Sequence, residues 1–484
     1  MSKIKKLAGE TVIYGLGNIL PRFLNFLLVP IHTSFFHAEE YGIYTKLMAL
    51  VGVLNILYSF GMETAFFRFT TKEGADPKKI FNIAQTAVTG ISTVLTALLI
   101  FFSAGVAKLL SVEGHENFIV WLALIMFVDN VVSIPFARLR LEKKPLQFAF
   151  FRVSNVMIQI GLTLYFLYVV FDPAMGIAYL FLANLIANGF YLLFFAKTFF
   201  TWRPAYDRAM FSSMIGYAYP IMLTGLAGMM NEFFSRIALD KWLPDNFYPG
   251  KTAAFAVGVF GVCYKLSVFM NLTVQAFRMA AEPFFFSHAT DRNSPQLFAR
   301  VNHYFIIVCC FILLAVSINL DWLKILFLRK EEYWVGLSIV PPLLLGYLFL
   351  GVYYNFSVWF KLTDRTYFGT IITLGGALLT LLLNYLLIPV AGYQGSSWAT
   401  VIVYGAMMVV CYGLGQKYFP IPYFVWIDAG YIAGTYLLLT VVNSISFSTQ
   451  LQATTFQAAT MLLFLVFVYA VERTGIRQQI NGQG

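Results

Sequence analysis

The sequence predicts an all-α protein that crosses a membrane many times, and three observations support this prediction. Of the 484 residues, 59% are hydrophobic and only 12% are charged, with a mean hydropathy of +0.73. A soluble domain carries about 25% charged residues. Apolar runs of about 20 residues, the length that a helix needs to cross a bilayer, recur along the whole chain. The loops between them are short linkers, which leave no room for a soluble catalytic domain.

These apolar runs predict about 14 transmembrane helices. In residue numbers they are 10–31, 41–63, 81–104, 117–136, 148–171, 177–196, 214–235, 254–278, 301–318, 334–358, 368–389, 396–415, 425–443 and 452–471.

The loops indicate the orientation, because cytoplasmic loops carry an excess of Lys and Arg. With a cytoplasmic N-terminus, the inside segments hold 22 of these residues and the outside loops hold 7. We therefore expect both termini in the cytoplasm. The net charge of +10 reflects this bias and gives no reason to invoke nucleic acid.

The cysteines do not indicate a metal centre. Cys263, Cys309, Cys310 and Cys411 all fall in predicted spans, and their spacing fits neither a zinc site nor a disulfide framework. We expect them to be packing residues. No cofactor is predicted beyond a possible coupling ion, Na⁺ or H⁺.

An internal repeat is indicated by matched glycine and polar positions. A shift of 216 residues places Gly42-Ile-Tyr44 on Gly258-Val-Phe260 and Asn55 on Asn271. A shift of 219 places "EKKPLQF" (142–148) on "KLTDRTY" (361–367). Six spans separate the copies, so the repeat would be parallel, as in transporters whose halves rock. The alternative is chance similarity between apolar segments.

The repeat predicts three parts. Residues 1–205 form an N-terminal six-helix lobe, 206–420 a C-terminal six-helix lobe, and 421–484 two additional helices with a cytoplasmic tail.

Polar residues interrupt the first predicted span on one helical face. Asn18, Arg22 and Asn25 are spaced four and three residues apart. A charge at mid-span costs roughly 2.5 kcal/mol or much more. Arg22 must therefore face a bundle interior or a water-filled cavity.

Similar stripes occur in three further spans. The candidate substrate-binding residues are Asn18, Arg22 and Asn25 in the first span, Lys46 and Asn55 in the second, Arg152 and Gln159 in the fifth, and Lys265, Asn271 and Gln275 in the eighth. Their positive excess indicates an anionic ligand, because arginine and lysine suit phosphate contacts. Alternatively, acids such as Glu63 or Asp129 neutralise these cations within a packed bundle.

The seventh span carries both signs of charge. Glu232 and Arg236 are four residues apart and are expected to pair. Alternatively, Glu232 joins Asn384 and Thr400 in an oxygen site for Na⁺, since these residue types suit a hard cation.

Two segments resemble a known family. "EEYGIYTKLMALVGVLNILYSFGMETAFFRF" (39–69) is similar to the N-terminal signature of polysaccharide-biosynthesis flippases of the Wzx type, and "LLLNYLLIPVAGYQGSSWAT" (381–400) is similar to that family's signature in the second half. These flippases belong to the MOP exporter superfamily, with the lipid II flippase MurJ and the MATE drug exporters.

The resemblance implies two six-helix lobes in a MATE/MurJ-like arrangement plus two C-terminal helices. It implies alternating-access export of an undecaprenyl-diphosphate-linked oligosaccharide across a bacterial cytoplasmic membrane, for cell-surface polysaccharide biosynthesis, with polysaccharide-assembly proteins as possible partners. The family's cationic cavity would fall on Arg22, Lys46, Arg152 and Lys265. A Na⁺ site of related lipid II flippases would fall near Glu232, Asn384 and Thr400, although Asn384 stands where an acidic residue is usual.

Three other functions remain open at this stage. One is a MATE-like exporter of drugs or organic cations, which would need acidic cavity groups where this first span has Arg22. A second is a lipid II flippase. The third is a membrane polymerase or ligase that acts on glycolipids. That chemistry needs a catalytic constellation, and the short outside loops show no paired carboxylates or nucleophile–base motif, so we expect no enzyme.

Overall fold

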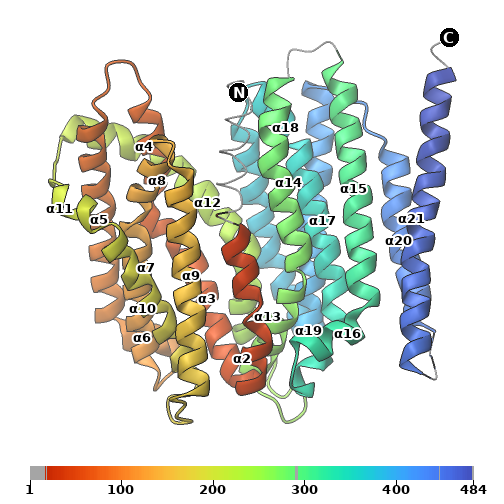
Figure 1. The fold of residues 1–484 in the computed structure, drawn as a ribbon, viewed down its shortest axis with the longest axis horizontal. Helices are drawn as coiled ribbons and strands as arrows, with labels where there is room; N and C mark the ends of the chain where they lie inside the picture. Colours follow the sequence, from red (N-terminus) through yellow and green to blue (C-terminus); the bar gives the residue numbers. More distant parts are fainter. Residues whose placement is uncertain (1–16, 18, 289–292, 446, 448, 482–484) are drawn as a thin grey trace. The chain divides into compact units, whose positions relative to one another are not determined.

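The computed structural model describes residues 17, 19–288, 293–445, 447 and 449–481. In these ranges every regular element is a helix and no strand occurs (Figure 1). The all-α prediction is therefore confirmed.

The number of membrane spans is the part of the fold prediction that is not confirmed. Each of the fourteen predicted spans overlaps a helix in the described ranges. Nine helices of this part of the chain are long and apolar enough to cross a membrane, or ten if the bent pair α13 (Ala253–Leu266) and α14 (Val268–Ser287) counts as one span.

The difference has local causes. The first predicted span is described only as a short apolar helix, Ile19–Phe35, and α10 (Ala178–Phe194) has only 17 residues. In α12 (Arg208–Trp242), Pro220 and several polar residues dilute the apolar run. Predicted spans 368–389 and 396–415 form one long element, α19 (Tyr367–Tyr418), which is interrupted at Gly392.

The interruption of α19 requires a glycine. Gly392 has a φ of 56°, in the left-handed region that side chains disfavour. A Cβ atom built there would lie 2.2 Å from the Tyr248 hydroxyl oxygen. The chain therefore turns at Gly392 between two straight helical stretches.

The chain divides into two compact units, which we describe separately. The first unit comprises residues 1–262 and 373–396, and the second comprises 263–372 and 397–484. This division follows contacts within the chain and does not test the predicted lobes 1–205, 206–420 and 421–484, which stay a prediction.

The first unit is a bundle around α3 (Ala38–Ser59), which packs along α12. The remaining helices are α2 (Val29–Phe35), α4 (Met62–Thr70), α5 (Pro77–Phe101), α6 (Ser103–Leu109), α7 (Glu116–Val131), α8 (Ser133–Leu141), α9 (Pro145–Tyr168), α10, α11 (Ala196–Thr201), residues 253–262 of α13 and residues 373–396 of α19. Within it, α7 packs against α5 and α10, and α10 packs against α9 (Figure 1). Buried aromatic rings, among them Phe136, Phe151 and Phe195, fill the space between α8, α9 and α10.

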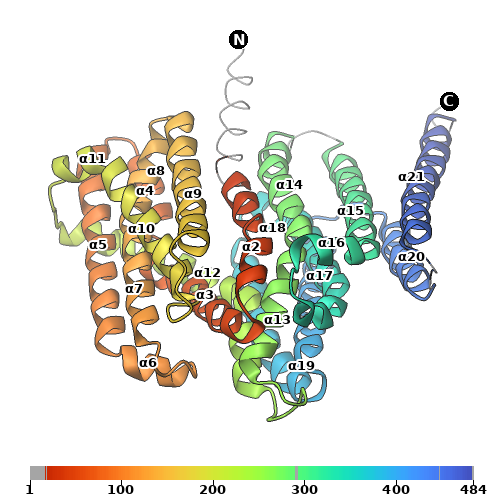
Figure 2. The ribbon, with the colours of Figure 1, turned by 60° about the horizontal axis from the view of Figure 1, so that its bottom comes forward.

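Helices α3 and α13 cross at glycines (Figure 2). A Cβ atom on Gly42 would lie 1.9 Å from the Ala254 carbonyl oxygen, and one on Gly258 would lie 1.8 Å from the Ala38 carbonyl oxygen. Residues 38 and 42 correspond to 254 and 258 under the 216-residue shift. The contact is therefore reciprocal, like the contact across a two-fold axis.

The second unit is built around α15 (Ser294–Ile318), which packs against α17 (Val340–Phe356), α20 (Val425–Asn443) and α21 (Gln450–Asn481). Its other elements are α14, α16 (Leu320–Phe327), the 3₁₀ helix η1 (Glu331–Ile339), α18 (Val358–Leu362) and the remainder of α19. Helix α15 is deeply buried, with Leu313, Leu314 and Cys309 fully enclosed.

Candidate functional site

Lys46 lies in a buried ion pair. Its Nζ atom is 2.6 Å from Asp240 Oδ1, and the two side chains are only 1% and 4% exposed. Asp240 lies near the end of α12, which α3 packs against. The sequence alone does not reveal this pair, because Lys46 and Asp240 lie 194 residues apart on different helices.

Two hydrogen bonds link the turn at Ser111 to Lys46 and to Lys241, which follows Asp240 in the chain. The Ser111 carbonyl oxygen accepts a hydrogen bond from Lys46 Nζ at 3.4 Å, and its hydroxyl oxygen accepts one from Lys241 Nζ at 2.9 Å. Ser111 has a φ of 51°, in the left-handed region. One short turn after α6 is thereby tied to α3 and α12.

Arg152 on α9 is surrounded by aromatic rings. Its guanidinium carbon lies 4.2 Å from the ring centre of Phe136 and 5.8 Å from that of Tyr191. Asp129 on α7 is close enough for its charge to attract Arg152. The two side chains are near neighbours, and neutralisation of Arg152 by Asp129 stays a prediction.

The polar residues that follow Arg152 on α9 serve helix packing. Asn155 Nδ2 donates to the Ala187 carbonyl oxygen at 2.8 Å and to Asn188 Oδ1 at 3.1 Å, both on α10. The Gln159 carbonyl oxygen accepts a hydrogen bond from Thr163 Oγ1 within the helix. Within this stripe, the Asn155 side chain joins α9 to α10.

Arg22 has an exposed side chain on the helix Ile19–Phe35. Asn25, on the same helical face, is partly buried, and its Oδ1 atom has no hydrogen-bond partner among the described residues. Asn18 lies outside the described residues. Asn55 on α3 accepts a hydrogen bond from Asn130 Nδ2 at 2.5 Å.

The predicted residues of the eighth span lie in the second unit. Gln275 Nε2 donates to Asn271 Oδ1, one turn apart on α14. Lys265 is partly buried near the end of α13, just before the bend into α14. Further along α14, Glu282 pairs with Lys361 at 2.6 Å and with Arg278 at 3.2 Å.

The other acid named as an alternative partner has a different role. Glu63 on α4 pairs with Arg140 on α8, which is not one of the four cations predicted for the cavity. This pair ties α4 to α8 within the first unit.

The residues predicted for Na⁺ fall in both units. In the first unit, Asn384 Nδ2 donates to the Thr380 carbonyl oxygen at 2.8 Å, and its Oδ1 atom accepts from Ser396 Oγ at 2.9 Å. Thr400 lies in the second unit, packed beside Gly346. Among the described residues no group of three or more His, Cys, Asp or Glu could hold a metal. The Na⁺ site stays a prediction.

The Glu232 backbone contacts a side chain of its own helix, α12. Its carbonyl oxygen accepts a hydrogen bond from Arg236 Nη1 at 3.1 Å. The preceding residue, Asn231, accepts a hydrogen bond from Thr380 Oγ1 at 2.9 Å, which ties α12 to α19 in the first unit.

Helices α20 and α21 enclose an apolar groove of about 720 Å³. Two glycines, Gly430 and Gly434, form part of its wall, and nothing lies within 4 Å of a Cβ atom built on either. Aromatic and aliphatic side chains, among them Phe456, Leu463 and Phe467, line the rest. The groove is long and apolar enough to take a hydrocarbon chain.

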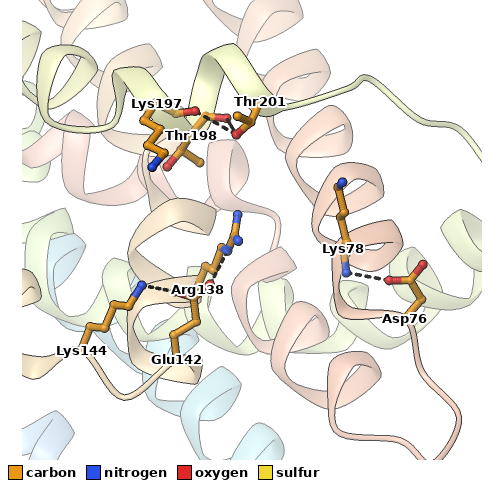
Figure 3. A network of polar contacts seen from close by, with 8 residues as sticks. All are labelled: Asp76, Lys78, Arg138, Glu142, Lys144, Lys197, Thr198 and Thr201. Carbon is orange, nitrogen blue, oxygen red and sulfur yellow. Dashed lines mark hydrogen bonds and ion pairs between the residues drawn. The ribbon is translucent and has the colours of Figure 1, made fainter.

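Figure 3 shows basic side chains on segments predicted to be cytoplasmic, at the ends of helices and in the turns that follow them. Glu142 pairs with Arg138 at 2.6 Å and with Lys144 at 2.7 Å. Burial alone would raise the pKa of Glu142, but the two cations outweigh it and hold the pKa below its ordinary value. The excess positive charge suits contact with anionic lipid headgroups.

Comparisons with known proteins identify the fold. The family model "Polysaccharide biosynthesis protein" matches residues 7–288. Among solved structures, the lipid II flippase MurJ in its inward closed conformation matches with a TM-score of 0.74 at 15% identity, over 96% of this chain and 100% of that chain.

Transporters of the MATE family match over less of the chain. An inward-facing multidrug resistance MATE family transporter of the MOP superfamily has a TM-score of 0.64 at 15% identity, over 82% of this chain and 94% of its own. An outward-facing structure of such a transporter has a TM-score of 0.57 at 16% identity, over 84% and 93%. No curated protein sequence matches. The predicted MurJ/MATE-like fold is confirmed.

Proposed function

Because the chain belongs to the polysaccharide biosynthesis protein family, we propose that it is a flippase for a polyprenyl-diphosphate-linked oligosaccharide. It would move the headgroup from the cytoplasmic to the outer leaflet by alternating access, for the assembly of a cell-surface polysaccharide. The chain is a multi-pass membrane protein with the fold of the MOP superfamily. Transport of a lipid-linked sugar is the proposed step.

The extent of the structural match is the observation that carries this proposal. The solved lipid II flippase covers 96% of this chain. Even if the whole uncovered 4% lay within residues 421–484, most of that segment would still be matched. The match therefore includes most of α20 and α21, whereas the two MATE structures cover 82% and 84%. These two helices form the apolar groove, which would hold a prenyl chain while the headgroup crosses.

Arg22 is the proposed contact for the diphosphate. Its guanidinium can make bidentate hydrogen bonds to phosphate oxygens. Its side chain is exposed on the helix Ile19–Phe35. Lys46 and Arg152 are more enclosed, Lys46 in its buried pair with Asp240 and Arg152 among aromatic rings. Lys265, Asn271 and Gln275 stay predicted headgroup contacts.

The proposed location is a bacterial cytoplasmic membrane with both termini inside, supported by the Lys and Arg bias of the loops. The cycle is proposed to be driven by Na⁺ or H⁺. Imposing a sodium gradient and a pH gradient separately on proteoliposomes would identify the ion.

The function can be tested with a polyprenyl diphosphate that carries one fluorescently tagged sugar. In proteoliposomes, a membrane-impermeant quencher reports how fast the lipid reaches the outer leaflet. We expect quenching to exceed that of protein-free vesicles and the glycolipid mass to stay unchanged. A changed mass would indicate an enzyme, and quenching equal to that of empty vesicles would contradict the proposal.

The role of Arg22 can be tested by native mass spectrometry with the same glycolipid. We expect Arg22→Gln to weaken binding about tenfold, because a charge-assisted phosphate contact is lost, while Arg22→Lys retains most of it. Preferential binding of an organic cation, or glycolipid binding indifferent to Arg22→Gln, would favour a MATE-like exporter with a structural Arg22.

A further inference from the structure

His303 of α15 lies between two carboxylates that come from the last two helices. Its Nδ1 atom is 2.5 Å from Asp428 Oδ1 on α20, and its Nε2 atom is 3.1 Å from Glu472 Oε1 on α21. The three side chains are 8%, 7% and 21% exposed. All three belong to the second unit.

This geometry requires an additional proton. A neutral imidazole has one N–H donor and one acceptor nitrogen, and an ionised carboxylate only accepts. Both ring nitrogens face carboxylate oxygens here. Both contacts are hydrogen bonds only when the cluster holds two protons, either on a charged imidazolium or on a neutral imidazole with one protonated carboxyl group.

Neighbouring polar groups complete the cluster. Tyr431 Oη donates to Glu472 Oε1 at 3.0 Å, and Asn302 Nδ2 lies 3.5 Å from Asp428 Oδ2. From α17, the Asn355 amide donates to Asn302 at 3.1 Å. The titratable groups near His303 are Tyr304 and Cys310 on α15, Asp428 and Tyr431 on α20, and Glu472 on α21.

The cluster joins three helices at one end of the groove. Tyr431 and Val471, which is next to Glu472, both line the groove between α20 and α21. Other polar contacts hold α21 far along its length from Glu472. Gln457 donates to the Ile318 carbonyl oxygen at 2.7 Å, and Thr454 accepts from Trp322 at 2.9 Å.

We propose that His303, Asp428 and Glu472 form a proton-binding site that holds α21 against α15 at this end of the groove. Release of one proton to the aqueous phase removes one hydrogen bond and leaves two carboxylates facing a neutral ring. Glu472 then separates from His303, while Gln457 and Thr454 keep the other end of α21 in place. The proton site does not depend on the proposed function, because none of these contacts involves a substrate.

The protonation state can be measured on the full chain in lipid nanodiscs without substrate. Nitrogen NMR of labelled histidines, with His303→Gln to assign the resonance, reports whether both ring nitrogens carry protons. Infrared spectroscopy, with Asp428→Asn and Glu472→Gln to assign the band, reports a protonated carboxyl group. At pH 7.5 a histidine in a short peptide, with its pKa of about 6.5, is mostly neutral. We expect the cluster to hold the additional proton there, on the ring or on a carboxyl group, and its absence from both would overturn the site.

The effect on α21 can be measured by amide hydrogen exchange, corrected for the intrinsic effect of pH. We expect protection around Glu472 to fall about tenfold as the proton is lost. Glu472→Gln should make this protection independent of pH, because the glutamine amide donates to a neutral Nε2 atom and replaces the proton.

Asp321→Asn, which removes an exposed carboxylate on α16, is the matched control and should retain the pH dependence. Exchange in the wild type that ignores pH, or a pH effect that persists in Glu472→Gln, would overturn the proposal. Either result leaves the flippase function untouched, because no glycolipid takes part.

Discussion

Lys46 and Asp240 connect α3 to α12 through a buried ion pair with an Nζ–Oδ1 distance of 2.6 Å. The two residues are 194 positions apart in the chain. Taking both charges out of solvent is costly, and their attraction offsets this cost only while both are present. The pair therefore makes each residue dependent on the other.

Removing one partner of this pair should destabilise the protein strongly. We expect Lys46→Met to cost about 3–5 kcal/mol, because Asp240 is left buried and uncompensated. The double variant Lys46→Met/Asp240→Leu should recover most of the loss. Thermal unfolding in detergent measures both. Breaking the exposed Lys324–Asp321 pair is the control, for which about 0–1 kcal/mol is expected.

The same double variant tests whether Lys46 serves helix packing or binds the diphosphate. If Lys46 serves packing, the stable double variant binds the glycolipid like the wild type, and this is the expected result. A well-folded double variant that no longer binds would return Lys46 to the diphosphate site.

The crossing of α3 and α13 should not tolerate a side chain at either glycine. We expect Gly42→Ala and Gly258→Ala each to destabilise the protein by about 1–3 kcal/mol, because an added methyl group meets a backbone carbonyl group that cannot turn away. Gly90→Ala on α5 is the control, since nothing lies within 4 Å of its Cβ position. Melting temperatures that are equal for all three variants would contradict the close approach.

Filling the groove between α20 and α21 should impair binding of the prenyl chain. Gly434→Phe places a ring in the 720 Å³ space. We expect binding of a long-chain polyprenyl diphosphate to weaken about tenfold or more, while binding of a short-chain analogue changes little. Gly413→Phe on α19 is a control at a glycine with open surroundings. Equal losses for both chain lengths would show that the groove does not hold the tail.

Asp207 should stabilise the start of α12 in a way that depends on pH. Its carboxylate pairs with Lys79 at 2.8 Å and accepts a hydrogen bond from the Met210 backbone N–H at 3.1 Å. The Lys79 ammonium, with help from this cap, holds the pKa of Asp207 below its ordinary value. The stabilisation is therefore present above the unfolded pKa of about 3.9 and is lost as the pH falls through the lower folded pKa.

We expect Asp207→Ala to lower the melting temperature at pH 7 more than Asp207→Asn, because asparagine still caps the helix. The difference between wild type and Asp207→Asn should shrink as the pH is lowered below about 4. A difference that stays constant across this range would show that the charge contributes nothing.

Local patterns predicted helix positions well where one helix forms one apolar run. The predicted span 425–443 coincides with α20, Val425–Asn443. The same reasoning separated 368–389 from 396–415, and α19 has a kink between these two stretches, at Gly392. Hydropathy alone does not show whether a chain bends or ends at such a point.

Charge partners were harder to predict, because they depend on which helices meet. The sequence shows that Lys46 needs compensation, but not that Asp240, on a helix 194 residues away, supplies it. The sequence does not single out His303, since its two carboxylates come from helices more than 120 residues further along the chain. Periodicity describes one helix at a time, and these sites belong to two or three.

The backbone contacts where α3 and α13 cross are related by a pseudo-two-fold symmetry, but the charged residue beside them is not. Gly42 and Gly258 occupy equivalent positions, yet the 216-residue shift that relates them places Lys46 on Val262. Duplicated segments can keep their contact geometry while one copy gains an ion and the other stays apolar. Replacing the Lys46–Asp240 pair by apolar residues would therefore change only one of the two positions that the 216-residue shift relates, and would leave its counterpart at Val262 as it is.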